Sequence, residues 1–272
     1  MVATLIKHEV LRTWRWIALA AGAALLLTSM SALAAALLPG PLNGLFGVLG
    51  IIFASVFPMA LLLMIGIDYY RSTFSKTGYF TAAIPARGST IYWVKFGYGS
   101  VVALLGLALT LGLAVIASIG FAHLNGGTAA DVFETIDAMW AALASIPAWL
   151  QALILVAILL YPSATLAQYF FAATVGSEAS FNRLGLGGPI LVWFLYYVAG
   201  QVVAVIGLFL PPTLDLTDPT APLLTYDPMA MFRDNQSGNA FLPLTALASV
   251  FLLAIVAMFW AKVSYDKRLE LR

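Results

Sequence analysis

Six long apolar stretches, separated by polar segments, dominate the pattern of hydrophobic and polar positions along the chain. An α-helix needs roughly 20 predominantly apolar residues to cross the hydrocarbon core of a bilayer, and each stretch is long enough. The pattern therefore predicts six transmembrane helices, at residues 17–38, 45–67, 96–122, 146–175, 185–210 and 241–261. The main polar segments between them are 68–95, 123–145 and 211–240. We predict an all-α integral membrane protein that forms one transmembrane domain over residues 1–272.

The first 16 residues have a different, amphipathic pattern. On a helical wheel the apolar arc holds Val2, Leu5, Ile6, Val10, Thr13 and Trp14, and the polar arc holds Thr4, Lys7, His8, Arg12 and Arg15. This arrangement is typical of a helix that lies in the membrane interface. Because the following apolar run is long and lacks a clear cleavage site, we do not expect a removable signal. Glu9 lies on the apolar side, where we weigh two states: pairing with a cation of segment 68–95, or simple exposure near a helix end.

Composition and charge fix the class and the orientation. The chain is 62% hydrophobic with a mean hydropathy of +0.97, which is too apolar for a soluble globular domain. The predicted topology places 12 of the 13 Lys and Arg residues on one side, and only Arg233 on the other. Cytoplasmic loops are the ones enriched in Lys and Arg. We therefore predict a multi-pass protein of the plasma membrane with both termini in the cytoplasm, outer segments at 123–145 and 211–240, and a cytoplasmic loop at 68–95.

Segment 68–95 concentrates charge in a chain with few charged residues. It holds four cations, Arg71, Lys76, Arg87 and Lys95, against the single acid Asp68. Residues 70–83 contain no proline, so a short helix is expected there, followed by a turn at Pro85. We interpret the segment as a loop that docks a cytoplasmic partner. The alternative is a solvated loop whose cations only set the topology.

Several kinds of chemistry are missing from the sequence. It contains no G-x-x-x-x-G-K-[ST] loop for ATP, and no H-E-x-x-H or G-x-S-x-G motif. His8 and His123 fall on opposite sides of the predicted membrane, so we expect no metal site. The predicted spans carry no ionisable residue near their centres, which disfavours a proton-coupled transporter. The chain is therefore not expected to be an enzyme by itself, and we predict no catalytic residue and no nucleic-acid partner.

Uncharged polar side chains do occur within the spans. We predict four of them as candidates to line a cavity: Tyr161, Gln168, Tyr169 and Gln201. The alternative is that they bond to neighbouring helices and serve packing alone.

The order of residues in segment 68–95 is similar to that of a known family. The elements are Asp68-Tyr-Tyr-Arg71, Gly78-Tyr79-Phe80-Thr81, Ile84-Pro85, Arg87 and Lys95. Together they resemble the loop between the second and third helices of ABC-2 type transporter permeases, and the N-terminal IKHEVLRTWR resembles the interfacial helix of that family. The chain departs from the family pattern at Ala82-Ala83-Ile84, where Thr-Leu is more common before the proline, and at Gly88.

The resemblance, which extends over essentially the whole chain, implies a fold and a function. The fold is the type V exporter-like transmembrane domain of the ABC-2 group. The function is that of a permease subunit that exports a hydrophobic or amphipathic substrate, such as a lipid, drug or peptide. ATP and Mg²⁺ would be bound by a separate ABC ATPase, and the permease would pair with a second copy or a paralogue. The expected ATPase-coupling residues are Phe74, Lys76, Thr77, Gly78, Tyr79, Phe80, Thr81 and Arg87. The alternative function is a membrane sensor or scaffold that uses the same loop without transport.

Overall fold

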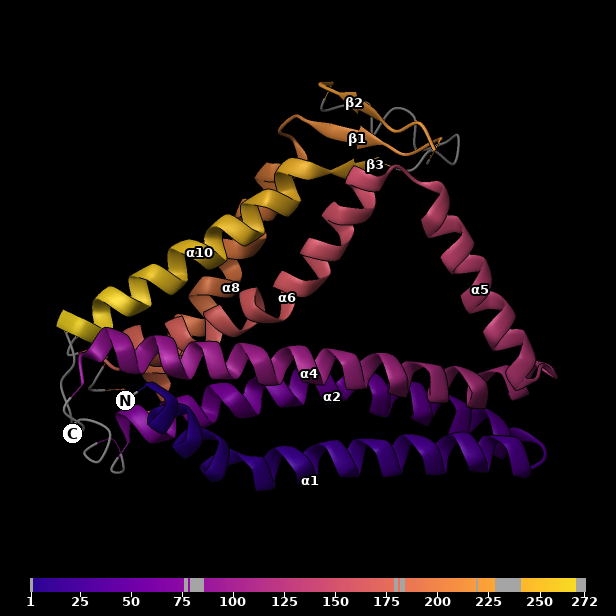
Figure 1. Cartoon of the computed structure of the whole chain (residues 1–272), viewed down its shortest axis with the longest axis horizontal. Helices are drawn as coiled ribbons and strands as arrows, with labels where there is room; N and C mark the ends of the chain where they lie inside the picture. The colour runs from indigo at the N-terminus through magenta and orange to yellow at the C-terminus, as the bar shows by residue number, and fades with distance from the viewer. Residues whose placement is uncertain are drawn as a thin grey trace. The chain divides into compact units, whose positions relative to one another are not determined.

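A computed structural model describes residues 2–75, 78, 86–178, 181, 184–218, 220–227 and 241–267. Its elements in chain order are α1 (Val2–Leu37), α2 (Pro41–Phe74), α4 (Gly88–Ala122), a 3₁₀ turn η1 (His123–Asn125), α5 (Ala129–Ser145), α6 (Ala148–Val175), α8 (Gly187–Leu208), β1 (Thr213–Asp215), β2 (Leu223–Thr225), β3 (Phe241–Pro243) and α10 (Leu244–Lys267) (Figure 1). The chain forms two compact units. Unit 1 comprises Met1–Asp68 with Trp93–Ala141, and unit 2 comprises Tyr69–Tyr92 with Ala142–Arg272, so the division falls inside α2, α4 and α5.

The prediction of six spans is confirmed. Among the described residues, six helices are long and apolar enough to cross a membrane: α1, α2, α4, α6, α8 and α10. Most of their large apolar side chains are exposed, as expected where lipid replaces water as the surrounding medium. The chain is thus a multi-pass membrane protein.

The second and third spans are longer than the apolar pattern indicates. α2 continues to Phe74 and α4 begins at Gly88, so only residues 75–87 lie between them, and the predicted loop 68–95 is too long at both ends. The reason is that Asp68 and Lys95 end the apolar runs without ending the helices. A helix of 34 residues, such as α2, is about 51 Å long, whereas the hydrocarbon core is about 30 Å thick. Each helix therefore has polar turns beyond its apolar stretch.

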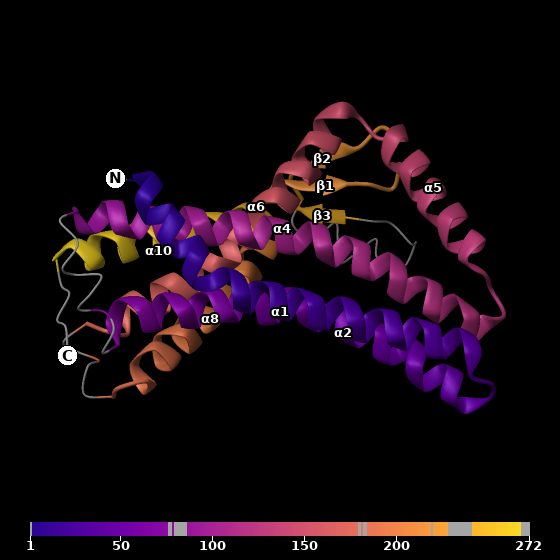
Figure 2. The same cartoon turned by 60° about the horizontal axis from the view of Figure 1, so that its bottom comes forward.

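α1 joins two elements that were predicted separately. The proposed interfacial helix 1–16 and the span 17–38 form one helix of 36 residues, because no proline or glycine interrupts the junction. The N-terminal turns nevertheless run at an angle to the rest of α1 (Figure 2). The apolar side chains Ile6, Val10 and Trp14 are exposed, as an interfacial position requires.

Two of the segments between the spans, 123–145 and 211–240, contain ordered structure among their described residues. Residues 123–145 hold the amphipathic helix α5, in keeping with the expected helical character of the chain. The segment after α8 forms three antiparallel strands in the order β2-β1-β3, with Leu214 paired to Leu224 and to Leu242. This small sheet is a correction to the all-α prediction. Strands of three residues are too short to produce a recognisable alternation of apolar and polar positions.

In unit 1, α1 and α4 pack through small residues, and α1, α2 and α4 run side by side (Figures 1 and 2). The buried positions of α1 are Thr13, Ala24, Thr28, Ser31 and Ala35. A methyl group added at Gly120 of α4 would lie 2.7 Å from the Cα atom of Ala32, so only glycine permits this approach. Small residues at helix contacts are typical of membrane proteins, where van der Waals packing replaces the hydrophobic effect.

In unit 2, α6, α8 and α10 pack against one another. The buried face of α6 lies in its second half, where Leu166, Ala167, Phe170, Ala173 and Thr174 are nearly inaccessible. The earlier residues of α6, from Leu155 to Tyr161, are mostly exposed. The core of this unit is therefore concentrated around the C-terminal half of α6.

Candidate functional site

Several residues of α2 and α4 that flank the connection 75–87 contribute to two clusters of side chains. One cluster lies in unit 1 and is built from charges. The other lies in unit 2 and is built from aromatic rings. Both contain residues of α2 and α4 within a few turns of the connection.

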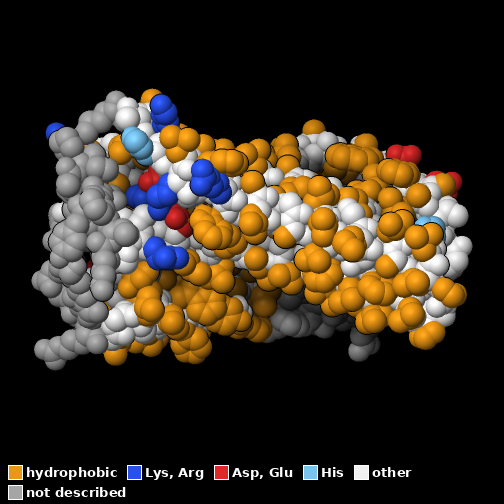
Figure 3. All heavy atoms as spheres, turned by 90° about the horizontal axis from the view of Figure 1, so that it is seen from below, with side chains coloured by type: hydrophobic (Ala, Val, Ile, Leu, Met, Phe, Trp, Pro, Cys, Tyr) orange, Lys and Arg blue, Asp and Glu red, His pale blue; other side chains and the backbone are white. Residues whose placement is uncertain are grey.

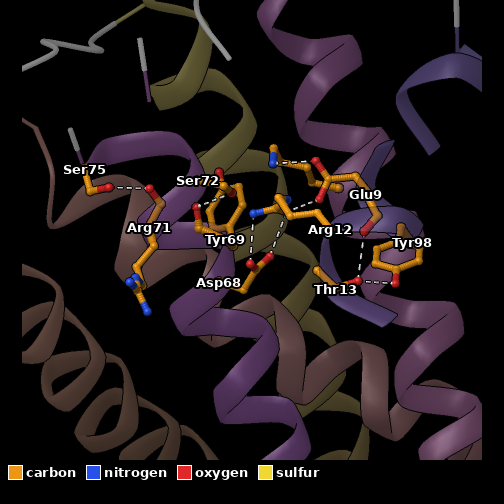
Figure 4. Close-up of polar contacts among 10 residues, drawn as sticks. Glu9, Arg12, Thr13, Asp68, Tyr69, Arg71, Ser72, Ser75 and Tyr98 are labelled. Carbon is orange, nitrogen blue, oxygen red and sulfur yellow. Dashed lines mark hydrogen bonds and ion pairs between the residues drawn. The ribbon is translucent and has the colours of Figure 1, made fainter. Parts of the chain in front are cut away.

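The ion cluster consists of Glu9, Arg12, Asp68 and Lys95. Arg12 of α1 donates two hydrogen bonds to the carboxylate of Asp68 on α2, at 2.9 and 2.8 Å. The guanidinium of Arg12 also pairs with Glu9 one turn earlier, and Figure 4 shows it between the two carboxylates. Lys95 of α4 donates to the other oxygen of Glu9 at 2.7 Å. The four charges therefore alternate in sign along the cluster, and α1 is joined to both α2 and α4.

Two of the four charged side chains are largely buried, so each needs an oppositely charged partner. The side chain of Lys95 is 6% exposed and that of Glu9 is 14% exposed, whereas Arg12 and Asp68 are about one-third exposed. A charge in a poorly solvated place is costly unless it is paired, and polar residues of membrane proteins accordingly pair with one another. The paired geometry thus fixes the position of the first turns of α1. One of the two states weighed for Glu9, pairing with a cation of segment 68–95, is confirmed.

A neutral hydrogen-bonded pair accompanies the charges. The hydroxyl group of Thr13, which is buried, bonds to the hydroxyl group of Tyr98 on α4 at 2.5 Å and donates to the carbonyl oxygen of Glu9 at 2.9 Å. This contact lies one turn after Glu9 on α1 and adds a second link between α1 and α4.

The aromatic cluster consists of Tyr69, Phe74, Tyr92, Phe170 and Tyr265. All five rings are buried, and they come from four helices, α2, α4, α6 and α10. The rings of Tyr69 and Phe170 are stacked with centroids 3.8 Å apart and planes inclined by 12°. Tyr92 meets Phe170 edge to face, with centroids 6.1 Å apart and an interplanar angle of 79°.

The hydroxyl groups of Tyr69 and Tyr92 have hydrogen-bond partners on other helices. The hydroxyl of Tyr69 bonds to that of Thr174 on α6 at 2.9 Å, and the hydroxyl of Tyr92 donates to the carbonyl oxygen of Met258 on α10 at 3.0 Å. Buried rings contribute large contact areas, and their hydroxyl groups need partners when they leave water. The cluster therefore fixes the ends of α2 and α4 against α6 and α10.

Gly88 lies close to α10 where α4 begins. A methyl group at this position would lie 2.9 Å from Asp266 Oδ1 and 3.0 Å from Tyr265 Cδ1. The first turn of α4 therefore passes close to the last turns of α10. Gly88 is one of the two departures from the ABC-2 loop pattern, and this close approach gives it a structural reason.

The structure describes three of the eight residues expected to couple to an ATPase. Phe74 is buried in the aromatic cluster, Gly78 is buried as well, and Arg87 is exposed directly before α4. Phe74 therefore packs inside unit 2. The other five lie outside the described residues: Lys76, Thr77, Tyr79, Phe80 and Thr81.

The four residues proposed to line a cavity belong to α6 and α8 of unit 2. Tyr161 of α6 is 62% exposed, and Gln201 of α8 is also exposed. Gln168 and Tyr169 are half-buried on α6. The described residues also contain no group of three or more His, Cys, Asp or Glu side chains able to hold a metal ion.

The sequence did not reveal which residues would meet Asp68 and Tyr69. The sequence did carry a signal for the charged residues. Glu9 is an acid among the N-terminal cations, and Asp68 is an acid at the end of an apolar run. No comparable signal pointed to Phe170 or Tyr265, because aromatic residues are common throughout the chain. No family model matches the chain, and no curated protein or solved structure matches it either.

Proposed function

We propose that this chain is the membrane-spanning subunit of an ATP-driven transporter of the ABC-2 type. The observation that carries the proposal is the pair of clusters at the ends of α2 and α4. A partner bound to the connection 75–87 would act on Asp68 and Lys95, which hold α1, and on Tyr69 and Tyr92, which pack against α6 and α10. The order of residues in segment 68–95, which resembles the coupling loop of ABC-2 permeases, supports the same proposal.

The distribution of charge supports a cytoplasmic place for this connection. In α1 the cations lie within the first 15 residues, and in α4 the only one is Lys95. The carboxylates of α5 follow the opposite end of α4. On the face shown in Figure 3, the coloured Lys and Arg side chains gather toward one end, hydrophobic side chains cover much of the described surface, and some Asp and Glu side chains lie at the other end. By the positive-inside rule the cation-rich end, with both termini, faces the cytoplasm.

Energy would come from a partner. Because the sequence has no phosphate-binding loop, ATP and Mg²⁺ would be bound by a separate ABC ATPase. The permease would act as a dimer with a second copy or a paralogue, in the plasma membrane. The substrate class that suits the proposal is hydrophobic or amphipathic, such as a lipid, drug or peptide, and the direction is export.

The experiment that tests the proposal is purification of the tagged chain from its native host in mild detergent, followed by measurement of co-purifying ATPase activity. The test variant is Tyr79→Ala with Phe80→Ala, at the centre of the motif. A matched control is Leu224→Ala with Tyr226→Ala, which removes two exposed side chains from the segment between α8 and α10. We expect ATPase activity with the parent chain and the control, and its loss with the test variant.

Two results would contradict the proposal. Purification of the parent chain without any ATPase would favour the sensor or scaffold, which has no need of ATP. ATPase recovery that is equal for the parent and the Tyr79→Ala/Phe80→Ala variant would place the docking surface elsewhere. Elution as a single, monodisperse peak in size-exclusion chromatography shows for each variant that folding is not the cause.

A further inference from the structure

Helix α5 has two chemically distinct faces. Its apolar residues repeat at helical spacing and form a continuous stripe, made of Val132, Phe133, Ile136, Met139, Trp140 and Leu143. The carboxylates of Asp131, Glu134 and Asp137 lie on the remaining surface, together with alanines and small polar residues. Segment 123–145 contains no Lys or Arg.

Among the described residues, the apolar stripe is partly to largely exposed. No residue of α5 is buried. Phe133 is 52%, Met139 67% and Trp140 64% exposed. A stripe of this size in contact with water would be unusual for a soluble surface, so something else covers it.

The neighbouring elements identify what covers the stripe. α4, which ends at Ala122, and α6, which begins at Ala148, are both candidate spans. Residues 123–128 and 146–147 are all that separates α5 from them. Two extended residues reach at most about 7 Å, so the C-terminal end of α5 lies at the membrane surface where α6 starts. Trp149, at that start, is exposed like the aromatic residues that mark a membrane interface.

We propose that α5 is an interfacial helix that binds zwitterionic phospholipid, with its apolar stripe among the acyl chains and its carboxylates toward water. Its charge selects the lipid class, because three carboxylates in a segment that contains no Lys or Arg are repelled by an anionic membrane surface. This inference rests on the six spans and is independent of any role in ATP-driven transport.

The test uses the absence of cysteine from the chain. Single cysteines carrying a nitroxide spin label are introduced in the full-length protein on the stripe, as Ile136→Cys and Met139→Cys, and on the opposite face, as Ala138→Cys and Ala141→Cys. Leu105→Cys, at an exposed position of α4, is the lipid reference, and Tyr226→Cys, after β2, is the water reference. Each protein is reconstituted into phosphatidylcholine vesicles, and collision of the label with oxygen and with a water-soluble nickel complex is measured.

We expect the two stripe positions to resemble the lipid reference, with high oxygen and low nickel accessibility. The two positions on the opposite face should resemble the water reference. High nickel accessibility on both faces would overturn the proposal, since the helix would then stand in water. Low accessibility to both reagents on the stripe would overturn it as well, because protein, such as a second copy, would then be the cover.

A second arm tests the lipid class. When half of the phosphatidylcholine is replaced by phosphatidylglycerol, nickel accessibility at the stripe should rise while that of the lipid reference stays constant. An unchanged or deeper position in anionic vesicles would contradict the assignment to zwitterionic lipid.

Discussion

Asp68 and Tyr69 are consecutive residues of α2, yet they are held by contacts of opposite kinds. Asp68 accepts two hydrogen bonds from Arg12 in the ion cluster of unit 1. Tyr69 is stacked on Phe170 in the aromatic cluster of unit 2. The former contact depends on a few charged atoms in one geometry, whereas the latter depends on the contact area of whole rings.

The two kinds of contact differ in their directionality and in their sensitivity to salt. A bidentate arginine–carboxylate pair is directional, so it specifies how α1 is placed against α2, and it is weakened by salt where water reaches it. Stacked and edge-to-face rings respond little to salt and resist separation in proportion to the area lost. We therefore expect α1 to be the helix whose contact changes more easily, and the packing around α6 to be the more rigid one.

The largest effect is expected from Tyr69→Ala. This substitution removes a buried ring, its stacking on Phe170 and its hydrogen bond to Thr174, and truncation of a buried aromatic residue costs about 3–5 kcal/mol. Thermal unfolding in detergent measures the loss. The control is Tyr161→Ala on α6, where the ring is 62% exposed and the change should be small. Equal effects of the two substitutions would show that the aromatic cluster does not stabilise the fold.

A smaller effect is expected from Lys95→Met in the ion cluster. Glu9 would lose one buried partner but keep Arg12, so the cost should be about 2–3 kcal/mol, below that of leaving a buried charge fully unpaired. The double variant Glu9→Gln/Lys95→Met should be more stable than Lys95→Met alone, since Arg12 and Asp68 remain as a neutral pair. Additive losses in this double-mutant cycle, measured by thermal unfolding, would rule out a direct contact between Glu9 and Lys95.

The spans could be predicted from the sequence, whereas most of the contacts between them could not. Apolar runs of 20 or more residues predict six spans because the bilayer imposes their length. The ends of α2 and α4 were not predictable in the same way, because Asp68 and Lys95 are polar residues that a helix tolerates once each has a partner. Glu9 stood out as an acid on an apolar arc, and pairing with a cation of segment 68–95 was one of the two states weighed for it.

The aromatic cluster and the small sheet were beyond such reasoning. Phe170 and Tyr265 are separated by almost 100 residues, and nothing in an apolar helix marks which ring faces the protein and which faces lipid. The glycine at the start of α4 looked like a departure from a motif, and only the position of Tyr265 supplies its reason. The sequence alone therefore predicts which segments cross the membrane much better than it predicts which side chains join them.

A third prediction uses salt to separate the two clusters. Asp68→Asn should destabilise the protein by about 1 kcal/mol at low salt, a modest value because Asp68 and Arg12 are each about one-third exposed and screened by water. Raising NaCl from about 0.1 to 1 M shortens the screening length from about 10 to 3 Å, so the difference from the parent should shrink. The loss caused by Tyr69→Ala should stay constant under the same conditions. A salt-independent effect of Asp68→Asn would indicate that this carboxylate acts through packing.

The smallest effect is expected at two carboxylates that accept hydrogen bonds within their own turns. Asp215 Oδ1 accepts hydrogen bonds from the backbone N–H and the hydroxyl group of Thr217, at 2.9 and 2.5 Å, and these bonds lower the pKa of Asp215. Asp218 has the same relation to Thr220, and its pKa is lowered for the same reason. Because each pKa is lower in the folded state, the stabilisation is complete above the usual aspartate pKa and is lost as the pH falls through the folded value.

Hydrogen exchange of the amides of Thr217 and Thr220, corrected for the intrinsic rate, should therefore show protection that decreases by a few-fold as the pH falls below about 4. Asp215→Asn should remove this pH dependence at Thr217 and leave it at Thr220, because each carboxylate serves its own turn. If both amides lost their pH dependence together, the two turns would unfold as one unit. The two kinds of carboxylate would then differ further. Carboxylates bonded across helices would fix tertiary structure one pair at a time, whereas Asp215 and Asp218 would act only through the stability of the whole segment between α8 and α10.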